Sequence, residues 1–169
     1  MFFTGTSEHT IDDKNRVSIP AVHRNQLKDA PEGNLWFVVP GNAARSLRLY
    51  PASCFKEMSR AIEGGWFAPE EVQEFEDTLM AFAERAEVDS AGRIVLPAGH
   101  VRRANLGREV TIAGSRDHLT IHDREAFATQ SDEKWRDYPD TVRKARQAAK
   151  SRWRQPGREA GGGNGPVET

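Results

Sequence analysis

An internal repeat limits the possible folds of this chain more than any other feature of its sequence. Residues 11–23 read IDDKNRVSIPAVH, and residues 88–100 read VDSAGRIVLPAGH. At a fixed offset of 77 residues, five pairs are identical and three more exchange one aliphatic side chain for another. The identical pairs are Asp12/Asp89, Arg16/Arg93, Pro20/Pro97, Ala21/Ala98 and His23/His100. Two similar halves in one chain predict a pseudo-twofold arrangement.

A second similarity follows each copy, so the repeat covers a unit of domain size. Residues 47–55 read LRLYPASCF and residues 119–127 read LTIHDREAF, now at an offset of 72. We therefore place one unit at residues 5–62, a helical connector at 63–83 and the second unit at 84–136. A basic helix at 137–154 and a disordered tail at 155–169, rich in glycine and proline, are expected to follow.

Each unit is predicted to contain a strand, a tight turn, a strand, a short helix, a strand pair and a closing helix, which is an α+β fold. Val17 and Ile19 alternate with Ser18, and Ile94 and Leu96 alternate with Val95, which is the period of two expected of half-buried strands. The later strands are expected at 35–39, 47–50, 110–113 and 119–121. The prolines that follow the first strand pair suit the first position of a helix, where no backbone donor is needed.

Apolar stripes predict helices between the two copies. Five apolar residues recur at steps of three and four, the spacing of one helix face: Val72, Phe75, Leu79, Phe82 and Ala86. A shorter stripe of Phe55, Met58 and Ile62 precedes it. Such stripes form core or subunit contacts, and this second use predicts an oligomer because one small domain cannot cover them all.

The repeated turn contains the candidate functional residues. Asp12 and Asp89 open the turns and are expected to accept backbone N–H bonds. Asn15 and Gly92 fit the left-handed position, which few other residues tolerate. We therefore predict two rigid turns, which hold Arg16 and Arg93 in place.

An arginine oriented by a carboxylate offers a rigid fork that suits phosphate or the O6/N7 edge of guanine. Arg16 and Arg93 are therefore candidate DNA-binding residues. Lys14, at the tip of the first turn, adds a charge for phosphate. Its counterpart in the second copy is Ala91, so the two halves cannot contribute equally.

Charge is distributed unevenly along the chain. Lys and Arg total 24 and Asp and Glu total 25, a net charge of −1, which excludes a uniformly basic nucleic-acid binder but not a local basic face. Residues 56–90 carry ten acidic and three basic side chains, whereas residues 142–158 carry seven basic and no acidic ones. The basic segment is either a solvated helix face or a source of phosphate contacts.

Residues 1–135 resemble the MraZ family of bacterial transcription regulators. The resemblance lies in the two paired motifs and in the Met-Phe-x-x-Gly that precedes them. The resemblance implies tandem AbrB-type swapped-hairpin units, which interlace into one small β-barrel, and a ring-shaped homo-oligomer. It also implies binding of double-stranded DNA through the motif arginines Arg16 and Arg93, with Asp12 and Asp89 as the other motif residues, at short direct repeats upstream of the protein's own division and cell-wall gene cluster. Asn15 stands where the family usually has glycine.

Three alternatives remain beside the DNA-binding regulator. No nucleophile elbow, phosphate loop or zinc motif is present to support an enzyme. His118 and His122 are expected at the surface, and His23 and His100 in a shared packing or capping role. An AbrB-type antitoxin would hold a toxin through its tail, but the tail offers Val167 alone as an apolar anchor. The third alternative is a structural ring or scaffold.

The sequence also predicts a location and a set of partners. The longest apolar runs are far shorter than the roughly 18 residues of a membrane span, and no signal peptide is recognisable. Cys54 is the single cysteine, which excludes an internal disulfide and a zinc cluster of cysteines. We expect a cytoplasmic, nucleoid-associated protein whose partners are DNA and itself, with no metal, cofactor, membrane or small-molecule substrate.

Overall fold

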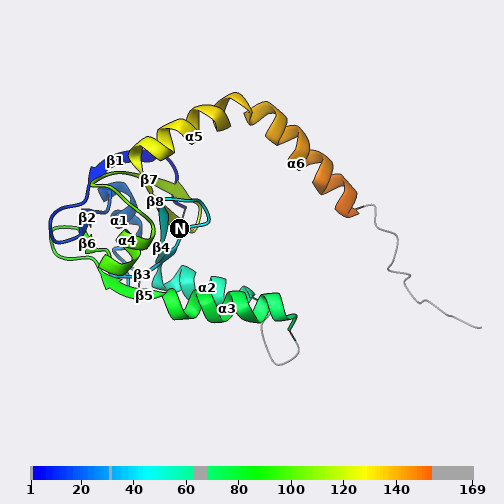
Figure 1. Ribbon diagram of the computed structural model, residues 1–169. Helices are drawn as coiled ribbons and strands as arrows, with labels where there is room; N and C mark the ends of the chain where they lie inside the picture. The colour runs from blue at the N-terminus through cyan, green and yellow to red at the C-terminus, as the bar shows by residue number, and fades with distance from the viewer. Residues whose placement is uncertain (1, 31, 63–67, 154–169) are drawn as a thin grey trace, which may run out of the picture. The chain divides into compact units, whose positions relative to one another are not determined.

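The two copies of the repeat fold into matching series of strands in the computed structural model, which describes residues 2–30, 32–62 and 68–153 (Figure 1). The first copy supplies β1 (Thr6–Thr10), β2 (Arg16–Ser18), β3 (Leu35–Pro40) and β4 (Ser46–Pro51). The second supplies β5 (Glu84–Glu87), β6 (Arg93–Val95), β7 (Glu109–Ser115) and β8 (His118–Asp123). The predicted α+β class and the predicted strand positions are therefore confirmed.

The strands pair between the two copies as well as within them. The larger sheet has the order β1-β7-β8-β4-β3-β5, and β2 pairs with β6 in a separate two-stranded ribbon. The first strand of each copy lies beside the third strand of the other: Thr6 is opposite Ala113 on β7, and Leu35 on β3 is opposite Glu87. All these pairs are antiparallel. Exchanging the two copies leaves this strand order unchanged, as a pseudo-twofold arrangement requires.

A closed barrel was expected, and this part of the prediction is wrong at the level of strand pairing. Among the described residues, β1 and β5 are the two edges of the larger sheet and do not pair with each other. The physical reason is that the backbone N–H and C=O groups of β2 and β6 bond to each other. The ribbon therefore does not join β1 to β5 as part of the larger sheet. Short contacts link this ribbon to the edges, such as the bridge between Val88 and Ile94.

The main core lies where the two copies meet. Trp36, Leu49, Ile94, Ile112 and Ile121 are all 0 % exposed and belong to one apolar cluster. The ribbon contributes to it from its inner face, since Val17 and Ile94 face each other across β2 and β6. Burying side chains from both copies in one core ties the two halves into a single unit.

The short helices α1 (Ala21–Arg24) and α4 (Ala98–Arg103) follow β2 and β6, and a 3-10 turn, η1 (Asn25–Leu27), extends the first. Pro20 and Pro97 are the N-caps of these helices, one position earlier than predicted. His23 and His100 are both 4 % exposed, and each ring packs edge-on against a phenylalanine, Phe3 or Phe82. The repeated histidines thus have the predicted packing role.

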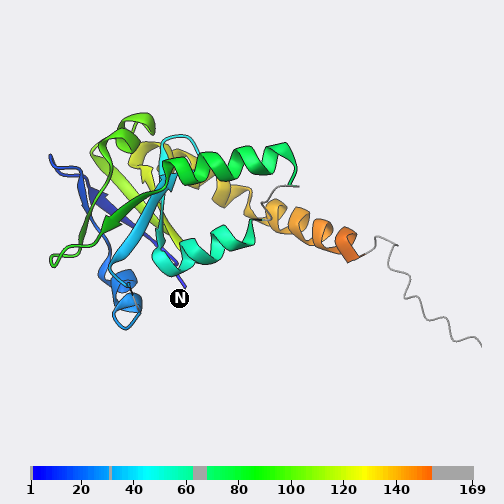
Figure 2. The same ribbon diagram turned by 90° about the horizontal axis from the view of Figure 1, so that it is seen from below.

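Two longer helices, α2 (Ala52–Ala61) and α3 (Glu70–Phe82), extend beyond the sheet (Figure 2). The predicted stripe of α3 runs one turn too far, because Ala83 is extended and Ala86 lies in β5, opposite Trp36. Phe55 and Leu79 join a second apolar cluster with Val39 and Tyr50. These contacts cover only part of the two helices.

The chain divides into a compact unit up to Thr129 and another that begins at Gln130. The closing helix α5 (Arg124–Arg136) spans this boundary, and α6 (Tyr138–Trp153) lies in the second unit. Within the described residues, no helix is long and apolar enough to cross a membrane. The predicted tail at 155–169 lies outside the described residues.

Candidate nucleic-acid interface

The first turn, residues 12–16, is held closed by one carboxylate. Oδ1 of Asp12 accepts the backbone N–H groups of Lys14 and Arg16, each at 2.9 Å. Oδ2 of Asp12 accepts Nε and Nη2 of Arg16, each at 2.7 Å. Asn15 has a φ of 56°, so the turn uses the left-handed position predicted for this residue. The carboxylate therefore fixes the turn and the guanidinium together.

The second turn, residues 89–93, repeats this geometry. Oδ1 of Asp89 accepts the backbone N–H groups of Ala91 and Arg93, each at 2.9 Å. Oδ2 accepts Nε of Arg93 at 3.1 Å and Nη2 at 3.0 Å. Gly92 takes the left-handed position, with a φ of 78°. Two copies of one motif have thus folded into the same hydrogen-bonded structure.

The pKa values of the two aspartates respond to these bonds. The side-chain hydrogen bond from Arg16 lowers the pKa of Asp12 from 3.8 to about 2. The pKa of Asp89 is also lowered, first by the backbone N–H of Arg93 and then by its guanidinium. Both carboxylates are therefore ionised at neutral pH, and both salt bridges are intact.

The β2–β6 ribbon brings the two arginines onto one surface. Arg16 lies opposite Val95, and Arg93 lies opposite Ser18. Since paired residues point to the same face and Val17 and Ile94 face the core, these four side chains point outward. The Cα atoms of Arg16 and Arg93 are then diagonal neighbours, about 7–8 Å apart. The structure therefore places Arg16 and Arg93 side by side, although they are far apart in the sequence.

Each arginine keeps one edge free for another molecule. The aspartate occupies Nε and one hydrogen of Nη2, and within the described residues Nη1 of neither arginine has a hydrogen-bond partner. Arg16 is 27 % exposed and Arg93 is 37 % exposed, so the free edges can be reached from solvent. The remaining Nη1/Nη2 fork is the edge that binds two acceptors at once.

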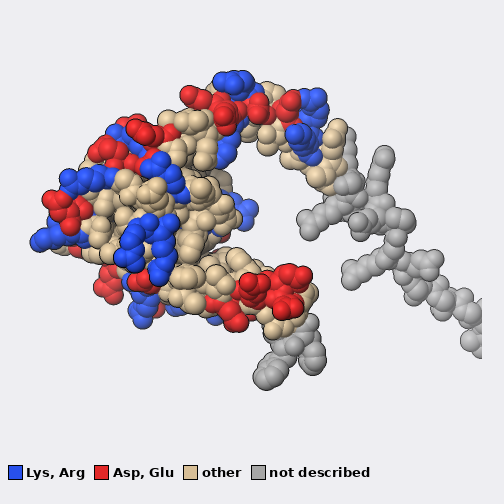
Figure 3. All heavy atoms as spheres, viewed as in Figure 1, with Lys and Arg blue, Asp and Glu red and all other residues tan. Residues whose placement is uncertain are grey.

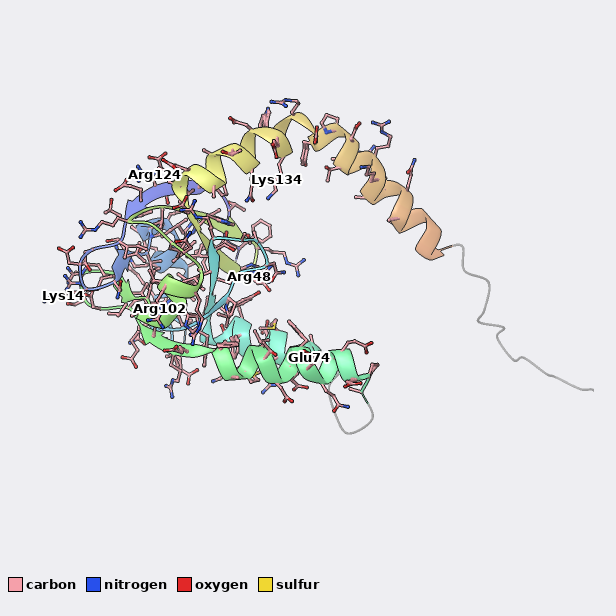
Figure 4. All side chains as sticks on the ribbon, in the orientation of Figure 1. Lys14, Arg48, Glu74, Arg102, Arg124 and Lys134 are labelled. Carbon is pink, nitrogen blue, oxygen red and sulfur yellow. The ribbon has the colours of Figure 1, made fainter. Side chains whose placement is uncertain are left out.

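The two turns project from one end of the first unit, opposite α2 and α3 (Figure 2). Lys14 extends at this end (Figure 4), where basic and acidic side chains lie interleaved in the space-filling view (Figure 3). The acidic members include Asp13, which is ion-paired with Arg108. By contrast, acidic side chains such as Glu74 predominate on α3 (Figures 3 and 4). The acidic surface of α3 therefore repels a polyanion, whereas the end with the turns carries both signs of charge.

Two histidines predicted at the surface, His118 and His122, are less exposed than expected. His118, predicted at the surface, has a side chain only 12 % exposed, because its ring stacks on Tyr50 at 4.5 Å and bonds to Asp117. Burial lowers its pKa. His122, its neighbour on β8, is half-buried and packs against Phe127.

One cation beside the turns was not predicted. Arg24, on α1, lies against Gly92 of the second turn. No local motif indicates this contact, because it joins the first copy to the second. The sequence offers one signal, which is a difference between the two copies. At the offset of 77 residues Arg24 is replaced by Val101, and Gly92, which leaves room for the arginine, is replaced by Asn15.

Comparison with known proteins supports the resemblance. The family model described as "MraZ protein, putative antitoxin-like" matches residues 2–72 and 79–150. The "Transcriptional regulator MraZ" of Corynebacterium efficiens is 36 % identical over 131 residues, which cover 78 % of this chain and 87 % of the relative. The protein of the same name from Mycolicibacterium smegmatis is 34 % identical over 125 residues, covering 74 % and 83 %.

A third relative of that name, from Leuconostoc citreum, is 32 % identical over 136 residues, covering 80 % of this chain and 85 % of the relative. MraZ is a family of transcriptional regulators and not of enzymes, which excludes the enzyme alternative. The family model spans both copies of the repeat. On this evidence, the chain belongs to the MraZ family.

Proposed function

We propose that this protein is a transcriptional regulator that binds double-stranded DNA through the two Asp–Arg turns. Arg16 and Arg93 read guanine edges, and Lys14 contacts phosphate. The observation that carries the proposal is the pair of carboxylate-locked guanidinium groups on the outer face of one two-stranded ribbon. The major groove of B-DNA admits a β-ribbon of this kind, and a bidentate arginine is the commonest contact to guanine there.

The target is expected to be a set of short direct repeats upstream of the protein's own division and cell-wall gene cluster. The names of the relatives, which are those of transcriptional regulators, support a regulatory DNA site in general. A regulator of this kind acts in the cytoplasm, at the nucleoid. Footprinting on the DNA upstream of its own gene, with a salt series, tests the location, since a scaffold protein gives no salt-dependent protection.

The arginines are tested by the variants Arg16→Ala and Arg93→Ala. Removing one bidentate guanine interaction is expected to cost about 1–3 kcal/mol, which is about 5- to 150-fold in affinity per site engaged. Arg16→Lys and Arg93→Lys keep the charge but not the fork, so they retain non-specific binding and no longer discriminate between sequences. The measurement is a titration of specific and scrambled DNA by fluorescence anisotropy.

Arg60→Ala is the matched control, because Arg60 is a basic residue on α2, away from the turns. It is expected to bind DNA as the unaltered protein does. If the Arg16→Ala/Arg93→Ala protein keeps full affinity while it remains folded, the interface lies elsewhere.

The paired copies also support an interlaced arrangement of the AbrB type. We infer that each repeat is a swapped-hairpin unit, with one chain supplying both members of the pair. The support is that β1 pairs with β7 and β5 with β3, so each copy completes the sheet of the other. This arrangement brings the two turns together for one DNA site.

We further propose that several chains assemble into a ring. Phe75 is 55 % exposed, Met80 is 40 % exposed and Phe82 is 36 % exposed, all on α3. Apolar side chains left open in this way are typical of subunit contacts. Several DNA-binding ribbons in one ring would bind adjacent direct repeats together, which raises affinity through the high effective concentration.

A further inference from the structure

The tip of the second turn lies beneath an arginine from the first copy. A Cβ atom added to Gly92 would lie 2.4 Å from Cζ of Arg24 and 2.6 Å from its Nε and Nη1. Gly92 is accordingly buried, although its neighbours Ala91 and Arg93 are exposed or half-exposed. Any side chain at this position would therefore move the guanidinium of Arg24.

Arg24 is anchored at one atom and unpaired at the others. Its Nε donates to the carbonyl oxygen of Ile19 at 3.0 Å, and the N–H of Ile19 donates to the carbonyl oxygen of Gly92 at 2.9 Å. Within the described residues, its Nη atoms have neither a hydrogen bond nor an ion pair. The guanidinium is thus held beside the second turn, in a hollow also lined by Glu32 and Asp89, and makes no ion pair among the described residues.

The two turns differ in a compensating way. The first turn carries Lys14 at its tip, where the second has Ala91. The second turn carries Arg24 of the first copy beside it, whereas the equivalent residue of the second copy is Val101. Val101 is apolar and packs against the core. Each turn therefore has, besides its motif arginine, a cation without an ion pair among the described residues, namely Lys14 at the first turn and Arg24 at the second.

We propose that Arg24 is a third arginine of the DNA interface, which contacts a phosphate beside the second turn as Lys14 does beside the first. The proposal rests on the proposed function, because it assumes that the turns bind DNA. A phosphate is the fitting partner because Arg24 lies on α1 against Gly92, beside the ribbon face that carries Arg16 and Arg93 and not on it. Contacts of this kind fix the position of a protein on the duplex and do not read its sequence.

Arg24→Gln is the first test, because Nε2 of glutamine can occupy the place of the arginine Nε and keep the bond to Ile19. It removes the charge together with Cζ and the two Nη atoms of the guanidinium, and keeps the chain as far as the Nε position. Specific and scrambled DNA should lose affinity by the same several-fold factor, and the log–log salt dependence should become less steep by about 0.9. The measurement is a titration at several salt concentrations with the full-length protein.

Gly92→Asn provides an independent test. Asparagine is tolerated at the left-handed position of the first turn, as Asn15 shows, but its Cβ would displace Arg24. We expect Gly92→Asn to weaken DNA binding as Arg24→Gln does, and to cause no further weakening when it is added to Arg24→Gln. Ala91→Lys, which copies Lys14 into the second turn, should restore affinity to the Arg24→Gln protein.

A purely structural role for Arg24 predicts a different result. Arg24→Gln would then leave both the affinity and the salt dependence unchanged, and this outcome overturns the proposal. The control for the proposed function itself is the Arg16→Ala/Arg93→Ala protein, measured in the same series. If that protein also binds DNA normally, the proposed function fails, whereas normal binding by Arg24→Gln alone refutes only the role of Arg24.

Discussion

Asp12 shows how one carboxylate can support both a turn and a binding group. One of its oxygens accepts two backbone N–H groups, and the other holds the guanidinium of Arg16. Removing the charge should therefore loosen the loop and the arginine together. The pKa of about 2 makes this link measurable through pH.

We predict that the difference in stability between the unaltered protein and Asp12→Asn depends on pH. The folded pKa lies below the ordinary value of 3.8, so the ionised carboxylate stabilises the fold fully above about pH 4. That stabilisation is lost as the pH falls through about 2, where the folded-state carboxyl becomes protonated. Thermal unfolding of both proteins between pH 7 and pH 2 should show the gap in melting temperature closing.

Asp89→Asn is the matched variant for this measurement, because its turn has the same bonds and its pKa is shifted in the same direction. It should show the same closing gap. A difference that stays constant down to pH 2 would contradict an electrostatic role for these carboxylates.

At the scale of residues, the repeat was enough to predict the local chemistry of the turns. The left-handed positions of Asn15 and Gly92 follow from turn geometry, which depends on neighbouring residues alone. Arg24 could not be predicted in the same way. Its contact with Gly92 joins residues of different copies, and only the fold brings them together.

At the scale of elements, the register of the β2–β6 ribbon gives a sharp prediction. Ile94 is 0 % exposed on the inner face, whereas Val95, next to it, is 53 % exposed on the outer face. Ile94→Ala should cost about 2–5 kcal/mol of unfolding free energy, because it leaves a cavity in the core. Val95→Ala should change it by less than about 0.5 kcal/mol. Chemical denaturation of both variants measures the two values.

The two variants check each other, since a shift of the ribbon by one residue would exchange their faces. Equal decreases in stability for Ile94→Ala and Val95→Ala would contradict the pairing. A larger decrease for Val95→Ala would indicate the shifted register.

The basic helix α6 gives a second prediction at this scale. Its described side chains Arg143, Lys144 and Arg146 are all exposed. If they bind phosphates, deleting residues 142–169 should reduce the salt dependence of DNA binding by about 0.9 for each phosphate that is no longer neutralised. Specific and non-specific DNA should then weaken alike, leaving their ratio nearly unchanged. An unaltered salt dependence would identify a solvated helix face instead.

Helices and strands were predicted well where a periodic pattern of apolar residues determines them. They were predicted less well where pairing with a distant strand determines them. β3 follows from a run of apolar residues, and β8 follows from the alternation of Leu119 and Ile121 with polar residues. The end of α3 was misplaced because Ala86 continues the helical spacing, although its backbone pairs with Trp36 in the sheet. Strand pairing between the copies is a long-range choice that a local pattern does not specify.

At the scale of the whole molecule, assembly is the testable property. Phe75 on α3 is more than half exposed. If α3 forms the subunit contact, Phe75→Glu should move the sedimenting species from a multiple of 18.9 kDa towards 18.9 kDa itself. Gln73→Glu adds the same charge on the same helix and should leave the assembly intact. A monomer of the unaltered protein at micromolar concentration would refute the ring.

The exchange of strands between the copies has a consequence for how the chain is made. Thr6 is paired with Ala113, so β1 has no partner until most of the chain has left the ribosome. The first copy also lacks β5, the edge strand that covers β3. During synthesis it is therefore half of a sheet, in which β3 and β4 can pair with each other while β1 and β2 lack their partners until the second copy emerges. Because both copies belong to one chain, the second copy is held at a high local concentration beside the first, which favours pairing within the chain over pairing between chains.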